Sequence, residues 1–126
     1  MTHVVESSVV LAYTMNEPGG QELLVPQRCL HLSIVNLAEV YTKVAERGGD
    51  ITDARRVIET LGLRIRAFRE AHAEGVARLR PLTSHRGLSL GDRACLALAE
   101  IVGLPVLTAD HKWIDLGLEI DIRMIR

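Results

Sequence analysis

Residues 89–110, SLGDRACLALAEIVGLPVLTAD, contain the clearest helix and strand of this sequence. Ser89 is a residue type that caps helices, and the apolar run after it continues to Gly103, a residue type that ends them. Residues 104–108 then form a short apolar run suited to a buried strand, and Asp110 follows it. A helix that leads into a buried strand is typical of parallel sheets, whose strands are joined by helical crossovers.

Extended and helical segments alternate along the rest of the chain. The further extended stretches are residues 3–5, 30–33, 63–68 and 119–126. The last two alternate between polar and apolar side chains, which favours positions near a sheet edge. We therefore expect an α/β fold, a three-layer α/β/α sandwich with a mainly parallel sheet of about five strands. Residues 35–61 predict a helical hairpin, and residues 80–87, which include Pro81, predict a loop.

Composition limits the size of the protein and its mode of binding. The chain has 126 residues, 48% of them hydrophobic, which is enough to build the core of one domain over residues 1–126. Its 15 Lys and Arg nearly balance its 16 Asp and Glu. This balance argues against a general positive field that attracts nucleic acid, so any such contact must be local.

The cysteines and the length of the apolar runs predict where in the cell the protein is located. Cys29 and Cys95 lack CxxC spacing and lie in apolar surroundings, so we expect buried free thiols in a reducing environment, and zinc is disfavoured. No apolar run approaches about 18 residues, and no basic segment precedes a long apolar stretch at the N-terminus. We therefore expect neither a membrane span nor secretion, but a protein of the cytoplasm.

Two acids occupy positions close to predicted helix starts. Glu39 follows Asn36 by three residues, and Asp92 follows Ser89 by three. Each spacing fits a capping box, in which the third helical residue binds the backbone of the cap. Capping alone could therefore account for both acids.

Two other acids follow predicted strands. Glu6 ends the first strand, and Asp110 follows the strand at 104–108, although Asp110 could also cap the segment that contains Trp113. In parallel α/β sheets ligands bind beyond the carboxyl ends of the strands, where the helices carrying Glu39 and Asp92 also begin. We therefore expect the four carboxylates to converge, with a cation compensating their repulsion.

An all-carboxylate site without organised His or Cys favours Mg²⁺ or Mn²⁺. Such a metal activates a water and stabilises charge on a phosphate, so phosphodiester hydrolysis is the reaction that this site serves best. A phospho-acceptor receiver domain also gathers acids around Mg²⁺ and is the alternative from another class. It would need an adjacent acid pair after the first strand, where this chain has Glu6, Ser7 and Ser8.

At these residues the sequence resembles the PIN-domain nucleases, and most closely the VapC-type toxins of toxin–antitoxin pairs. The matching segments are residues 4–8, 11–12, 16–19, 33–40, 87–99 and 104–110, with Trp113. The resemblance implies a Mg²⁺-dependent endoribonuclease that acts on RNA and is inhibited by a cognate VapB-type antitoxin. It also implies a homodimer.

The resemblance assigns roles to particular positions. The residues that match the family's acidic quartet are Glu6, Glu39, Asp92 and Asp110, and those that match its supporting polar positions are Ser8, Asn36 and Thr108. Asp115 is a further candidate acid. The family ordinarily has Asp where this chain has Glu6, and the extra methylene moves the carboxylate by about 1 Å, which can cost about a hundredfold in rate. A catalytically weakened PIN domain that acts as a binding partner, through natural divergence or engineered attenuation, is therefore an alternative.

Contacts with RNA and with partners are the remaining expectations. Arg93 and Lys112 each neighbour a proposed metal acid, which makes them the best candidates for phosphate contacts. His111 beside Asp110 is the one histidine to test as a proton shuttle, and Trp113 is interpreted as a core anchor. The hairpin of residues 35–61 is the candidate contact with a dimer partner or an antitoxin.

Overall fold

A computed structural model describes residues 2–25 and 28–126 and contains one five-stranded sheet. The strands are β1 (Thr2–Val5), β2 (Cys29–Ser33), β3 (Arg64–Arg66), β4 (Val106–Thr108) and β5 (Ile122–Met124). They lie in the order β3-β2-β1-β4-β5, and every neighbouring pair is parallel. The expected α/β fold with a parallel sheet is confirmed, and β3 and β5 form the two edges.

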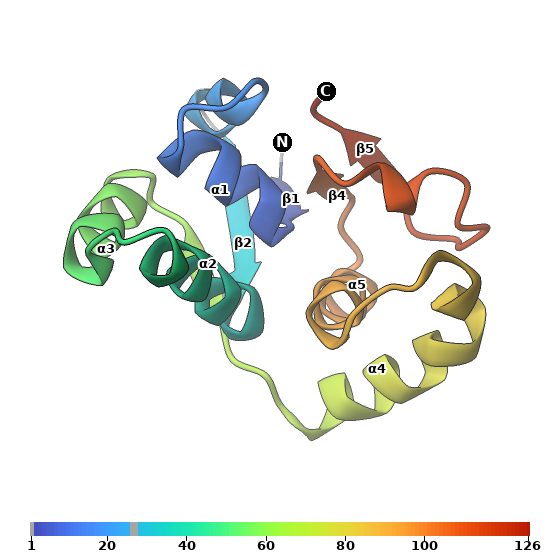
Figure 1. Cartoon of the computed structure of the whole chain (residues 1–126). Coiled ribbons are helices and arrows are strands. Elements are labelled where there is room, and N and C mark those ends of the chain that lie inside the picture. The colour runs from blue at the N-terminus through green and yellow to red at the C-terminus, as the bar shows by residue number, and fades with distance from the viewer. Residues whose placement is uncertain (1, 26–27) are drawn as a thin grey trace.

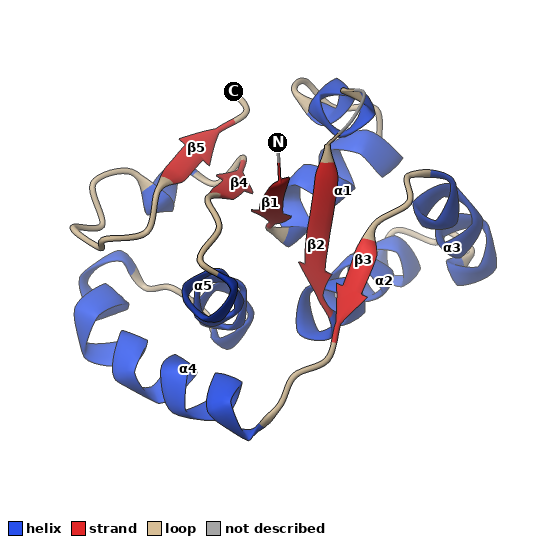
Figure 2. Cartoon of the chain, turned by 180° about the vertical axis from the view of Figure 1, so that it is seen from behind, coloured by secondary structure: helices blue, strands red, loops and turns tan. Residues whose placement is uncertain are grey.

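Helices cover both faces of the sheet (Figures 1 and 2). They are α1 (Ser7–Thr14), α2 (Ile34–Glu46), α3 (Ile51–Thr60), α4 (Glu70–Thr83) and α5 (Leu90–Val102), with 3-10 turns η1 (Gly20–Leu24), η2 (Ser84–Arg86) and η3 (His111–Trp113). Successive strand residues point to opposite faces. Val4 therefore packs into a core with α4 and α5, whereas Val5 packs into a second core with α1, α2 and α3.

Two helix boundaries differ from the sequence-based prediction. Helix α2 begins at Ile34 and is capped by Ser33, so Asn36 is the third residue of the helix and not its cap. Helix α4 continues through Pro81 to Thr83, where we had predicted a loop. The buried Leu79 and Thr83 explain this extension, because their packing offsets the backbone hydrogen bond that proline removes. The Thr83 hydroxyl also donates to the Leu79 carbonyl at 2.8 Å.

At the end of the sheet where the parallel strands finish, called the carboxyl edge below, strands turn directly into helices. Only Glu6 separates β1 from α1, and α2 follows β2 without a loop. The first turn of α5 reaches the same edge from the other layer, where Asn36 Nδ2 donates to the Gly91 carbonyl at 3.0 Å. The two acids that follow strands, Asp92 in the first turn of α5 and Glu39 in the second turn of α2 are therefore brought to one edge. Within residues 2–25 and 28–126, none of the helices is long and apolar enough to cross a membrane.

Candidate metal centre

Glu6 lies between β1 and α1 with only 4% of its surface exposed. Its Oε2 atom accepts hydrogen bonds from Ser8 N at 2.8 Å, from Thr108 Oγ1 at 3.2 Å and from the Ser8 hydroxyl. Its Oε1 atom accepts from Ser7 Oγ at 3.2 Å. Burial raises the pKa of the Glu6 carboxyl and the charge of Asp92 raises it further, against the opposing effect of the bonds from Ser8. Glu6 is thus a buried acid whose charged form is disfavoured by desolvation.

The hydroxyls of Ser8 and Thr108 connect this acid to the end of β4. Ser8 Oγ accepts from Ala109 N at 2.9 Å, and Thr108 Oγ1 accepts from Asp110 N at 3.0 Å. Each hydroxyl therefore accepts from the backbone that follows β4 and donates to Glu6. Both predicted supporting residues lie in direct contact with the first acid, where they fix its orientation.

Asp92 is also buried, with 6% exposure, and it takes part in the predicted capping box of α5. Its Oδ2 atom accepts from Ser89 N at 2.9 Å, and its own N–H donates to Ser89 Oγ at 3.1 Å. Within the described part of the chain Asp92 Oδ1 receives no hydrogen bond. Capping accordingly occupies one oxygen and leaves the other for a ligand.

Glu39 has no capping role. It is the sixth residue of α2, because this helix begins at Ile34, so the capping-box interpretation of Glu39 is wrong. Its Oε1 atom accepts from Asn36 Nδ2 at 2.8 Å. The same amide nitrogen donates to the Gly91 carbonyl, so Glu39 is held against the first turn of α5.

Asn36, the third predicted supporting residue, is fully buried at this junction of α2 and α5. Its amide nitrogen serves both Glu39 and Gly91, whereas its Oδ1 atom has no hydrogen-bond partner within the described residues. A buried amide oxygen without a partner is costly. It adds one more unused oxygen to the carboxylates around it.

Asp110 is placed differently from the other three acids. It caps η3 by accepting from Lys112 N at 2.9 Å, and Lys112 Nζ lies 3.8 Å from its Oδ2. Lys112 is thus an exposed cation directly beside a proposed metal acid, as its candidacy for RNA contact requires. Asp115 is exposed and has no hydrogen bond to the other acids within the described residues.

Three other residues singled out in the sequence make contacts within the fold. Arg93 NH1 donates to the Val76 carbonyl of α4 at 3.0 Å, so part of this guanidinium ties α5 to α4. His111 Nε2 lies 3.1 Å from the carbonyl oxygen of Arg126, at the end of the chain. Trp113 is 1% exposed and belongs to the core beside α5, as predicted.

The buried thiol of Cys95 is affected by the charges of three of the acids. This thiol is fully buried, and burial raises its pKa well above the ordinary value, with further contributions from the charges of Glu6, Asp92 and Glu39. The charges of these three acids therefore all reach the Cys95 thiol in the core. Cys29, the other free cysteine, is only partly buried.

The donor atoms fit a hard divalent cation better than zinc. Over residues 2–25 and 28–126, no three His, Cys, Asp or Glu side chains approach closely enough to form a complete metal cage. Magnesium uses few protein ligands and keeps several waters, so it does not require such a cage. The unused Asp92 Oδ1, the unpartnered Asn36 Oδ1 and the desolvated Glu6 carboxylate are oxygen donors of the kind it prefers.

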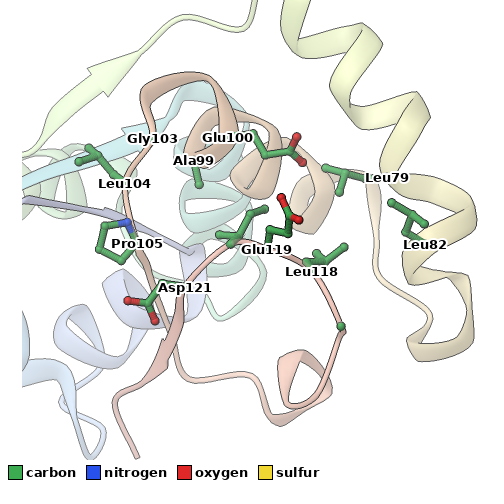
Figure 3. A pocket seen from close by; sticks show the side chains of 12 residues that line it. Leu79, Leu82, Ala99, Glu100, Gly103, Leu104, Pro105, Leu118, Glu119 and Asp121 are labelled. Atoms are coloured by element: carbon green, nitrogen blue, oxygen red, sulfur yellow. The ribbon is translucent and has the colours of Figure 1, made fainter.

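A hollow lies at the amino edge of the sheet, the end at which the parallel strands begin (Figure 3). It has a volume of about 660 Å³ and lies between the end of α5, the start of β4 and residues 117–121. Its acidic lining residues are Glu100, Glu119 and Asp121, and none of the predicted site residues contributes to it. Cavity size therefore points away from the acids that the sequence singles out.

Gly91 is a residue of the candidate centre that sequence reasoning missed. It lies one position before Asp92, and its carbonyl accepts from Asn36. The available signal was a glycine in the first turn of an otherwise strong helix. Ser33, which caps α2 through Val35 N at 3.2 Å, was also missed because it was interpreted only as the end of a strand.

The PIN-domain family model matches residues 3–118, so the chain belongs to the PIN-domain family. The receiver-domain alternative is thereby excluded. None of the curated proteins with which the sequence was compared matches it.

Solved structures extend this likeness over nearly the whole chain. The DNA-bound VapBC from Salmonella typhimurium has a TM-score of 0.74 at 16% identity, covering 100% of this chain and 99% of that one. VapC20 from Mycobacterium tuberculosis, described as a toxin that cleaves the sarcin–ricin loop, has a TM-score of 0.73 at 15% identity and covers 93% of both chains. VapBC-5 from the same organism has a TM-score of 0.64 at 25% identity, covering 99% of this chain and 98% of that one. The fold is thus similar to that of VapC toxins.

Proposed function

We propose that this PIN-domain protein is a Mg²⁺- or Mn²⁺-dependent endoribonuclease of the VapC toxin type, which hydrolyses RNA phosphodiester bonds. The observation that carries the proposal is the hydrogen bonding at the carboxyl edge of the sheet, where Asn36 joins Glu39 to Gly91, the residue before Asp92, and Thr108 joins Glu6 to Asp110. Membership of the PIN-domain family and the fold shared with VapC toxins support it. In this proposal Asp110 completes the acidic set from the end of β4.

The contribution of each residue follows from its contacts. Asp92 and Glu39 would hold the cation through their oxygens, with Asn36 keeping Glu39 in place. When bound, the cation supplies an activated water and stabilises charge on the phosphate. Ser8 and Thr108 hold the Glu6 carboxylate in one orientation, and its burial strengthens the electrostatic interactions of the site. Lys112 is positioned to contact a substrate phosphate.

Regulation and assembly are part of the same proposal. We infer a cognate VapB-type antitoxin as partner, because the similar structures include VapBC complexes. A hollow of about 460 Å³ between α1, α2 and α3 is lined by Val44, Ala54 and the exposed Val57, among others. This hollow supports the hairpin as the surface that contacts the antitoxin or the second copy of a homodimer. Ribosomal RNA is a candidate substrate, because VapC20 is described as cleaving the sarcin–ricin loop.

One observation favours a second function, a weakened PIN domain that binds without efficient turnover. Within the described residues the hydrogen bonds to the Glu6 carboxylate come from Ser7, Ser8 and Thr108, and the bond from Ser8 N also caps α1. A carboxylate so engaged has less freedom to bind a cation. Turnover would then be lost before binding of RNA or antitoxin is lost.

Metal-dependent cleavage of RNA tests the proposal. The purified protein is incubated with end-labelled ribosomal and transfer RNA in Mg²⁺, in Mn²⁺ and in excess EDTA, and Mn²⁺ binding is followed separately by electron paramagnetic resonance. We expect discrete cleavage products with either metal and none with EDTA. Equal cleavage in EDTA would contradict a metal centre, whereas Mn²⁺ and RNA binding without cleavage would favour the second function.

A further inference from the structure

Gly91, the second residue of α5, lies directly beneath the carboxylate of Glu39. A Cβ atom built on Gly91 would fall 2.5 Å from Glu39 Oε1, and still closer to Oε2 and Cδ. Real Cβ atoms do not approach other heavy atoms so closely. The carboxylate of one layer thus occupies the space that a side chain on the other layer would need.

Two contacts position the Glu39 carboxylate. On one side Asn36 Nδ2 donates to Glu39 Oε1 at 2.8 Å, and on the other the carboxylate rests on the bare Cα of Gly91. Asn36 also binds the Gly91 carbonyl, so the helix that provides the space is tied to the helix that provides the acid. Asp92 is the residue of α5 directly after Gly91, so the Glu39 carboxylate contacts the turn of α5 that carries Asp92.

Backbone conformation does not explain this glycine. Gly91 is absent from the residues with positive φ, among which are Gly87 and Gly103 on either side of it in the sequence. Alanine in place of glycine ordinarily stabilises a helix by about 0.5–1 kcal/mol. The glycine therefore weakens α5 locally, and the space it leaves is the one local feature that requires it.

We propose that Gly91 is a positioning residue of the metal centre, and that its missing side chain seats the Glu39 carboxylate beside Asp92. This inference rests on the proposed function. A methyl group at position 91 displaces the end of the Glu39 side chain, because that end is flexible and α5 is fixed in the core. The fold is retained, but the carboxylate no longer lies where the cation binds.

Gly91→Ala tests the proposal through two effects of opposite sign. We expect the metal-free variant to melt at the same temperature as the parent protein or higher, because alanine favours the helix. We expect its affinity for Mn²⁺ to fall by about tenfold or more, as for loss of a group that orients a metal ligand. The measurements are thermal unfolding without metal and Mn²⁺ titration by electron paramagnetic resonance. A purely structural role would move both quantities in the same direction.

Rescue and control variants complete the test. Glu39→Asp weakens Mn²⁺ binding in the parent protein, but it has a smaller effect in the Gly91→Ala background, because the shorter side chain avoids the added methyl group. Gly75→Ala changes a second helical glycine, which faces Ala97 in the contact between α4 and α5, and should leave Mn²⁺ affinity unchanged. Parent-like Mn²⁺ affinity in Gly91→Ala overturns this inference alone. Absence of Mn²⁺ binding by the parent protein overturns the proposed function and the inference with it.

Discussion

The carboxyl and amino edges of the sheet both carry acids, and they differ in what surrounds these acids. The acids of the carboxyl edge are Glu6, Glu39, Asp92 and Asp110, and those that line the hollow at the amino edge are Glu100, Glu119 and Asp121. At the carboxyl edge, hydroxyl, amide and backbone donors hold each carboxylate. At the amino edge, Glu100 and Glu119 are exposed around a hollow of about 660 Å³, and Asp121 pairs with Arg123 at 2.9 Å.

Neither the number of acids nor the size of a cavity therefore identifies the candidate site. Acids in water repel one another weakly and need no cation, whereas acids that are partly removed from water do. The raised pKa of Glu6 is the sign of that difference. Function should therefore depend on the carboxyl edge, and the amino edge should contribute to stability alone.

Asp92→Asn and Glu119→Gln make this contrast measurable with one charge removed at each edge. Asparagine can still accept the bond from Ser89 N, so we expect Asp92→Asn to fold normally. Its loss of a metal carboxylate should lower the rate of RNA cleavage by about a hundredfold or more, corresponding to several kcal/mol of transition-state stabilisation. Glu119→Gln should cleave at the parent rate. The two rates are compared at saturating Mg²⁺ with equal folded fractions.

Two results would contradict the expectation that catalysis depends on the carboxyl edge and not on the amino edge. If Asp92→Asn cleaves as fast as the parent protein, the carboxyl edge is not the catalytic site. If Glu119→Gln loses as much activity as Asp92→Asn, the hollow of the amino edge has a part in the reaction.

Glu6→Asp tests how the side-chain length of the first acid at the carboxyl edge affects turnover. Aspartate is a good helix cap, so the bond from Ser8 N that begins α1 can persist. The shorter side chain moves the carboxylate by about 1 Å, toward the position usual in the family, and we expect RNA cleavage to rise by up to about a hundredfold. The measurement is kcat with Mg²⁺ for both forms. Equal kcat values would show that the methylene has no effect on turnover.

The amino edge should respond in the opposite way, through stability alone. Gly103 ends α5 at this edge with φ of 68°, and a Cβ there would meet no atom within 4 Å. Gly103→Ala therefore adds only left-handed backbone strain, which should lower the free energy of unfolding by about 1 kcal/mol. Denaturant unfolding measures this loss, and cleavage per folded molecule should stay at the parent value. A fall in specific activity would mean that the two edges are coupled through α5.

Local patterns predicted much of this arrangement. The capping box of Ser89 and Asp92 is visible in the sequence because both members lie within one helical turn, and the structure has it as predicted. The start of α2 was predicted three residues too late, because Ile34 and Val35 extend the apolar run of the strand. A strand that becomes a helix without a loop leaves no turn residue to mark the boundary.

Contacts between layers could not be predicted. The contact between Glu39 and Gly91 joins residues more than 50 positions apart, and only the crossing of α2 and α5 brings them together. The extension of α4 past Pro81 also depends on the burial of Leu79 and Thr83 against neighbouring elements. Tertiary packing decides both features, and neither periodicity nor local propensity reports it.

The smallest expected effect is a pH dependence of stability that arises in the sheet itself. Burial lowers the pKa of His3, with contributions from Arg28 and Arg123, and it lowers the pKa of His31, with contributions from Arg66 and Arg64. The Arg123 and Arg66 guanidinium groups lie 3.4 Å and 3.1 Å from imidazole nitrogens of these histidines, which accept from them only when neutral.

Below the ordinary histidine pKa of 6.5, the unfolded chain therefore binds more protons at these two positions than the folded chain does. Stability should be complete above this pH and should fall as the pH drops through it. Urea unfolding between pH 8 and pH 5 tests this expectation, with His3→Gln as the variant and the exposed His85→Gln as its control. The His3→Gln protein should lose less stability on acidification than the control does. Identical pH profiles would show that the hydrogen bond between His3 of β1 and Arg123 of β5 contributes nothing to the pH dependence of stability.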